Sequence, residues 1–94
     1  FQDFGATFSP NGEWVAYVSD ETGIDEVYVR PFPGPGPRIS VSTEGGTGPV
    51  WTHDGQELFF EGNGQVQIVT AQLGPNPRFS RPKQLFESAA FRQK

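Results

Sequence analysis

The feature that most constrains this chain is an internal repeat. The segment FSPNGEWVAY at residues 8–17 returns as WTHDGQELFF at residues 51–60, a spacing of 43 residues. In both copies a polar turn with glycine precedes a run of strand-forming residues. A repeat of about 40 to 45 residues built from short strands is the period of a β-propeller blade, and one blade cannot cover both of its own faces. The repeat therefore predicts an all-β chain with two four-stranded antiparallel blades.

The first repeat divides into four short strands separated by turns. We expect these strands at residues 6–9, 13–19, 26–30 and 38–42. Residues Ser9 to Gly12 have the composition of a tight turn, because proline presets φ, asparagine forms a local hydrogen bond and glycine accepts a positive φ.

The second repeat has the same order of turns and strands. After its own tight turn at Thr52 to Gly55 we expect strands at residues 56–61, 65–70 and 83–86, with Gly62 to Gly64 as a compact hairpin turn. Only residues 87–91 have room for a short helical turn. We place the first blade at residues 1–46 and the second, with a short C-terminal tail, at residues 47–94.

Burial can be predicted from the strand interiors. Residues 14–18 read WVAYV and residues 58–60 read LFF, so apolar side chains occupy both phases of the alternation. A sheet with one face in water alternates polar and apolar residues, whereas a sheet covered on both faces does not. Two blades alone leave two outer faces uncovered. We therefore expect a larger ring, completed by a longer parent chain or by further copies of this one.

Charge and composition exclude several classes of partner. The chain up to Glu61 carries ten acidic side chains against two arginines, and the remainder carries five basic side chains against one acid. This acidic majority argues against nucleic acid as a partner. No run of about 18 apolar residues is present, so we expect no membrane insertion. The absence of cysteine removes disulfides and leaves the compartment open. The chain lacks an initiator methionine, so we expect a processed product or a fragment.

Catalytic chemistry is not indicated by any constellation of residues. His53 is the only histidine, it lies in a turn beside Asp54, and no Gly-x-Ser-x-Gly elbow is present. One histidine without cysteine leaves too few ligands for zinc. The glycine-rich stretches are not followed by Lys-Ser or Lys-Thr and a helix, so they do not predict phosphate binding. We predict that the chain is not an enzyme and holds no cofactor or metal.

Three segments resemble a known family of repeats. FSPNGEWVAY at residues 8–17, EVYV at 26–29 and PVWTHDG at 49–55 resemble the WD40-like repeat called PD40, found in the propeller of the bacterial translocation protein TolB. The resemblance covers about residues 4–87, with His53 in place of the usual proline. It implies a bacterial protein, with the compartment, periplasm or cytoplasm, left open. It also implies a ring of six blades, hence three copies of this chain or four further blades.

The same resemblance bears on function. EVYVRPFPG at residues 26–34 is similar to propeller segments attached to bacterial serine/threonine kinases and winged-helix regulators, which are regarded as sensor or interaction domains. It implies a non-catalytic module for protein or ligand interaction. PD40-like repeats also occur in the gating propellers of peptidases related to prolyl oligopeptidase, which is one alternative. A lectin built from few-bladed chains is another.

We expect the binding surface at the loops that join strands two to three and four to one, together with the hairpin turn of the second repeat. The carboxylates around Gly23 do not follow the spacing of a calcium loop, so a solvated loop is favoured over a cation site. The prolines of residues 31–37 alternate, which favours a stiff connection over a Pro-x-x-Pro docking motif. The predicted binding residues, for a protein or peptide partner, are Asp20, Glu21, Thr22, Asp25, Glu44, Thr47 and Asn63.

Overall fold

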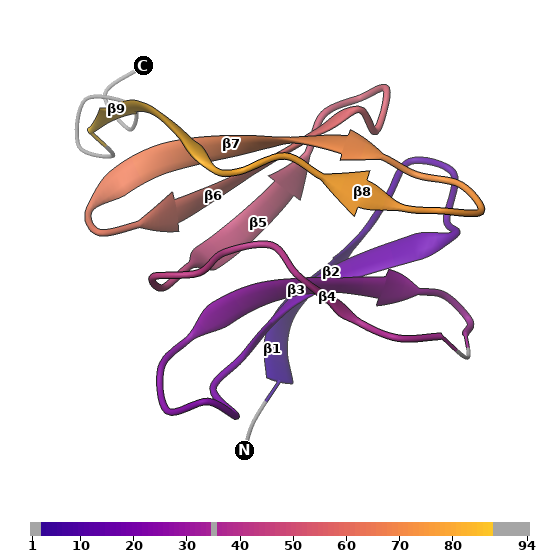
Figure 1. Cartoon of the computed structure of the whole chain (residues 1–94), viewed down its shortest axis with the longest axis horizontal. Coiled ribbons are helices and arrows are strands. Elements are labelled where there is room, and N and C mark those ends of the chain that lie inside the picture. The colour runs from indigo at the N-terminus through magenta and orange to yellow at the C-terminus, as the bar shows by residue number, and fades with distance from the viewer. Residues whose placement is uncertain (1–2, 35, 88–94) are drawn as a thin grey trace.

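The protein is described by a computed structural model that covers residues 3–34 and 36–87, with the backbone alone at residues 3–4 and 85–87 (Figure 1). Every regular element in this part of the chain is a strand. The strands are β1 (Asp3–Phe8), β2 (Trp14–Ser19), β3 (Glu26–Pro31), β4 (Ile39–Ser40), β5 (Thr47–Trp51), β6 (Glu57–Gly62), β7 (Gln65–Gln72), β8 (Arg78–Phe79) and β9 (Lys83–Glu87). Among these residues there is no helix that could cross a membrane.

The strands form two antiparallel sheets. The first sheet has the order β1-β2-β3-β4, and the second has the order β5-β6-β7, with β8 and β9 both paired to β7. Because β6 already occupies one edge of β7, β8 and β9 share the other edge: β9 pairs with residues 65–68 and β8 with residues 71–72. The predicted all-β class with two antiparallel sheets is confirmed.

The prediction of four strands in the second sheet is wrong, because this sheet has five. β7 continues to Gln72, and the turn at residues 73–77 brings the chain back as β8. Ser80 still contacts β7, since its N–H donates to Thr70 O at 3.0 Å. Pro82 then has no N–H for the ladder, so the strand is interrupted before β9. The sequence-based prediction treated only Lys83–Phe86 as the outer strand.

The two tight turns of the repeat have the same hydrogen bonds. In the first, Gly12 N–H donates to Ser9 O at 2.9 Å, and Asn11 Oδ1 accepts from Glu13 N–H at 3.0 Å. In the second, Gly55 N–H donates to Thr52 O at 3.0 Å, and Asp54 Oδ1 accepts from Gln56 N–H at 3.0 Å. The exchange of Pro10 for His53 leaves this pattern unchanged. The repeat in sequence is therefore also a repeat in backbone geometry.

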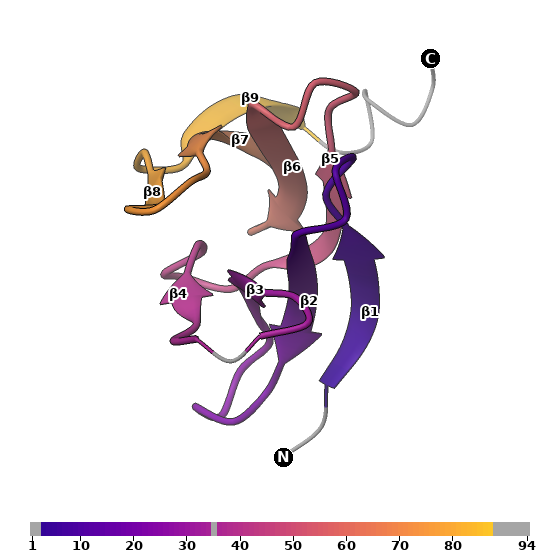
Figure 2. The same cartoon turned by 90° about the vertical axis from the view of Figure 1, so that its right-hand side faces the viewer.

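The two sheets pack face to face around one core. Alternate residues of β2 and β3 meet alternate residues of β6 and β7, as expected when one face of each sheet is buried. Figure 2 shows β1 and β5 together at one side of the stack and β4 and β8 at the other. The buried cluster consists of Trp14, Ala16, Val18, Val27, Val29, Val41, Leu58, Phe60 and Val69.

Four hydrogen bonds tie the sheets and their connection together. The indole N–H of Trp51 in β5 donates to Thr7 O in β1 at 3.1 Å. In the segment between the sheets, the buried Ser42 hydroxyl donates to the Glu26 carboxylate and accepts from Val27 N–H at 2.9 Å. Gly45 N–H also donates to Glu26 at 3.1 Å. The bonds to Glu26 and Val27 hold the segment that precedes β5 against the start of β3.

Candidate functional site

Three connections gather at one end of the strands. The β2–β3 loop, the β4–β5 loop and the β6–β7 turn lie at the left in Figure 1, opposite the two tight turns of the repeat. Antiparallel order requires this arrangement, because every second connection returns to the same end of a sheet. We call the surface formed by these three connections the loop end.

The β6–β7 turn has the tightest geometry of the three connections. Gly62 pairs with Gln65, so Asn63 and Gly64 form a two-residue hairpin loop. Their φ angles are +57° and +73°. Asn-Gly is the residue pair that accepts positive φ at both central positions, as a type I′ turn demands. The local sequence therefore fixes where Asn63 stands.

Four of the predicted binding residues surround one hollow at the loop end. Asp25, Glu44, Thr47 and Asn63 line a space of about 400 Å³. Glycines 45, 46, 62 and 64 also line it. Asp25 is held in place through its backbone, because its carbonyl accepts from Gly46 N–H at 2.9 Å. The structure thus brings residues from three connections to one site.

The remaining predicted residues lie in the β2–β3 loop outside this hollow. Glu21 forms an ion pair with Arg38. Thr22 is exposed, and the carbonyl of half-buried Asp20 accepts from Gly23 N–H at 2.9 Å. This part of the loop therefore lies toward the edge of the first sheet, and Ile24 and Asp25 of the same loop line the hollow.

Besides the glycines, two residues that line the hollow were missed by sequence reasoning. Glu61 ends up there because it pairs with Thr47 across β5 and β6. Ile24 adds an apolar side chain that is 52% exposed. The position of Glu61 follows from the strand register, which the sequence alone did not supply. Ile24 had a signal, since a large aliphatic residue in a polar loop is unusual.

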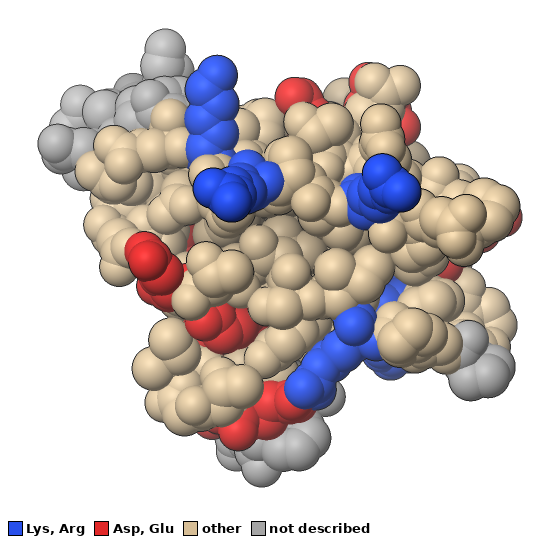
Figure 3. Space-filling view, viewed as in Figure 1, with Lys and Arg blue, Asp and Glu red and all other residues tan. Residues whose placement is uncertain are grey.

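The electrostatic character of the hollow is negative. Three carboxylates, Asp25, Glu44 and Glu61, line it, and its described lining contains neither lysine nor arginine. Figure 3 shows acidic side chains along the lower left of the molecule, over the β2–β3 and β4–β5 loops, and basic side chains over β8 and β9. Like-signed charges around a concave surface attract ions of the opposite sign. The loop end therefore suits a positively charged group.

The described residues contain no cluster of three His, Cys, Asp or Glu side chains arranged to hold a metal ion. His53 is exposed in the turn between β5 and β6, at the end of the strands opposite the hollow. Comparison with known proteins adds no assignment: no family model matches the chain, and no curated protein matches it.

Proposed function

We propose that this chain is a non-catalytic binding module that recognises a basic segment of a protein or peptide at its loop end. The observation that carries the proposal is the convergence of Asp25, Glu44 and Glu61 on one hollow beside exposed Ile24. A lysine or arginine side chain offers a cationic head for the carboxylates and an aliphatic stem for the isoleucine.

We further propose that the two sheets are blades of a larger β-propeller. Three features support this: the repeat of 43 residues, the chain-order packing of two antiparallel sheets, and the common side on which β1 and β5 lie (Figure 2). In such a ring the loop end of every blade faces the same side.

The experiment measures binding of fluorescent peptides of graded charge, from Lys- and Arg-rich to Glu-rich, by anisotropy. Glu44→Lys is the test variant, and Glu13→Lys is the matched control, because Glu13 is exposed near the tight turn at the opposite end. We expect a preference for basic peptides that Glu44→Lys weakens about five-fold, the size of one exposed charge contact. Glu13→Lys retains the wild-type affinity.

Two results would overturn this function. One is an affinity for basic peptides that both variants weaken equally, because the attraction would then come from net charge alone. The other is an affinity that does not fall as the salt concentration rises, because salt screens exposed charges with a Debye length of about 10 Å at 0.1 M.

A further inference from the structure

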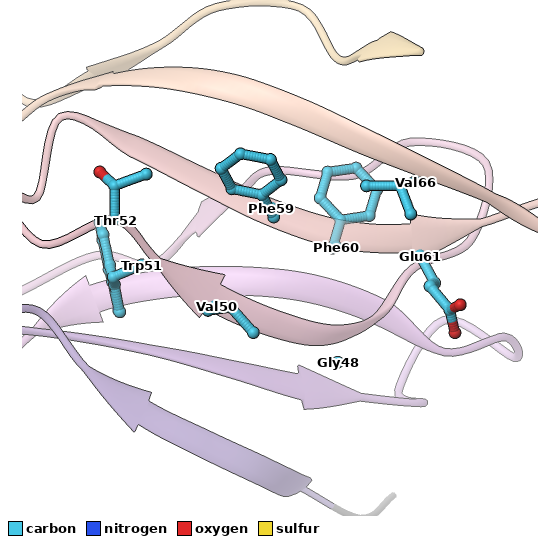
Figure 4. A pocket seen from close by; sticks show the side chains of 8 residues that line it. All are labelled: Gly48, Val50, Trp51, Thr52, Phe59, Phe60, Glu61 and Val66. Atoms are coloured by element: carbon cyan, nitrogen blue, oxygen red, sulfur yellow. The ribbon is translucent and has the colours of Figure 1, made fainter. Parts of the chain in front are cut away.

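The outer face of the second sheet carries an apolar hollow. Val50 of β5 pairs with Phe59 of β6, which pairs with Ile68 of β7, so the three side chains form one row on the face turned away from the core. Val50 is 59% exposed. Figure 4 shows the hollow of about 420 Å³ between Thr52 at one end and Glu61 and Val66 at the other.

The outer face of the first sheet is different in chemistry. Phe8, Val15 and Arg30 form one row across β1, β2 and β3. The Phe8 ring lies 4.6 Å from the Phe32 ring, and Phe8 is 48% exposed. The guanidinium of Arg30 lies over the Tyr17 ring at 5.7 Å. This face therefore presents aromatic rings beside a cation.

The two sheets of this chain contact each other through different faces of the repeat, which makes the contact head-to-tail. The first sheet contributes the face that bears Thr7, Ala16 and Val18, and the second contributes the face that bears Trp51, Leu58 and Phe60. The spacing of 43 residues makes Trp51 the equivalent of Phe8, and Leu58 the equivalent of Val15. The two outer faces are thus the repeat equivalents of the two inner faces.

This equivalence predicts which residues would meet if the same contact formed once more. Inside the chain, the Trp51 indole rests on β1 and donates to Thr7 O at 3.1 Å. Val50 is the repeat equivalent of Thr7, so Phe8 of a second copy would rest on Val50. These are two of the most exposed large apolar side chains of the described structure. Each one would bury the other.

The charges agree with this match. Register places Arg30 at the position of Val69, because Arg30 pairs with Val15 and Val69 pairs with Leu58. On the opposing face, Glu57 and Glu61 are the repeat equivalents of Trp14 and Val18. The internal contact is apolar on both sides. On the outer faces, the first sheet bears Arg30, and the second sheet bears Glu57 and Glu61 on β6 with Lys83, which pairs with Ile68, at its β9 edge. Complementary charge favours this pairing over the pairing of either face with itself.

We propose that the outer face of the second sheet docks the outer face of the first sheet of a second copy of this chain, with Phe8 of that copy seated in the hollow at Val50 and its Arg30 facing Glu57 and Glu61. The inference rests on the proposed blade architecture and adds the self-association surface to it. A contact of this type joins different faces, so it continues from copy to copy until the ring closes.

The test is the oligomeric mass of the full chain by analytical ultracentrifugation over a concentration series. Wild type is expected to associate. Val50→Asp disrupts the apolar hollow on the outer face of the second sheet, and Phe8→Asp disrupts the aromatic outer face of the first sheet. Each variant is expected to weaken association at least about 30-fold, as for an interface hot spot. Ile24→Asp is the matched control, because Ile24 is 52% exposed but lies at the loop end.

The mixing experiment separates a head-to-tail contact from a symmetric one. An equal mixture of Val50→Asp and Phe8→Asp proteins retains one intact surface of each kind, so it should form dimers and nothing larger. If circular dichroism shows that the Phe8→Asp protein is unfolded, Arg30→Glu replaces it as the variant of the outer face of the first sheet. A monomeric wild type, or a mixture that does not dimerise, would overturn the proposal.

The peptide-binding assay on the same proteins keeps the two proposals apart. Val50→Asp should retain its affinity for basic peptides, and Glu44→Lys should retain its association. Loss of association without loss of peptide binding concerns this interface alone, and the reverse result concerns the loop end alone.

Discussion

The two sheets differ most in their central strands. All six residues of β2 are buried, whereas β6 alternates between buried and half-buried residues. The inner phases of the two strands are alike. On the outer face, Val15 and Tyr17 of β2 are buried under side chains of neighbouring strands. The corresponding face of β6 has Glu57, Phe59 and Glu61, which are half-buried. The comparison shows that the repeat conserves backbone geometry and one apolar face, while the other face of each sheet is free to differ in chemistry.

The largest difference in unfolding free energy should separate substitutions on the inner and outer faces of β6. Leu58 is fully buried between the sheets and Phe59 lies on the outer face. Leu58→Ala is expected to cost about 3 kcal/mol of unfolding free energy, because a cavity forms in the core. Phe59→Ala, at a protein concentration where the chain is monomeric, should cost less than about 1.5 kcal/mol. Urea unfolding measures both, and equal losses would contradict the assignment of faces.

The next effect concerns the connection between the sheets. Ser42→Ala removes the hydroxyl that serves Glu26 and Val27 N–H inside the protein, so we expect a loss of about 2 kcal/mol. Ser40→Ala is the control. Its exposed side chain makes one bond of 2.8 Å, to Ser42 O, and its loss should cost below about 1 kcal/mol. The order of the two variants in urea unfolding is the decisive observation.

A smaller effect is expected where the sheets meet at β1 and β5. Trp51→Phe keeps an aromatic ring but removes the donor to Thr7 O. The expected loss is about 1 kcal/mol, the net value of one hydrogen bond. Amide exchange of β1 should accelerate in this variant while exchange of β7 is unchanged. Equal acceleration in both strands would show that the bond does not act locally.

The smallest effect separates the two tight turns. The Gln56 N–H and the Thr52 hydroxyl donate to Asp54 and hold its pKa below the ordinary value of 3.8. The charged form is therefore favoured in the folded state. Its contribution is complete above pH 3.8 and is lost as the pH falls through the lower folded pKa. Asn11, the equivalent residue of the first turn, does not titrate.

An NMR titration of the Asp54 carboxyl carbon measures this midpoint, which we expect below 3.8. Asp54→Asn should remove this titration. A wild-type midpoint at or above 3.8 would contradict the hydrogen bonds that the turn requires.

Much of the fold could be predicted from the sequence because its signals are local. The tight turns, the Asn63-Gly64 hairpin and the strands that follow them depend on residues within a few positions of each other. β8 was not predicted because its partners Ala71 and Gln72 lie beyond the predicted end of β7. Pairing with a neighbouring strand, rather than local preference, creates that element.

The candidate site was predictable only in part for the same reason. Topology placed Asp25, Glu44, Thr47 and Asn63 at one end, since alternate connections of antiparallel strands share an end. Which residues line the hollow depends on register and on local pairing. Glu61 enters through its pairing with Thr47, and Glu21 is drawn away by Arg38. Neither contact has a signature in the sequence.

The unequal lengths of two equivalent connections have a practical consequence. β6 and β7 are joined by two residues in a turn that tolerates few sequences, whereas β2 and β3 are joined by six residues with exposed Thr22, Gly23 and Ile24 at the tip. Exposed loop tips accept inserted sequence far better than tight turns do. A fluorescent reporter grafted between Thr22 and Gly23 would stand at the rim of the acidic hollow, so a change in its emission would test whether a ligand binds there.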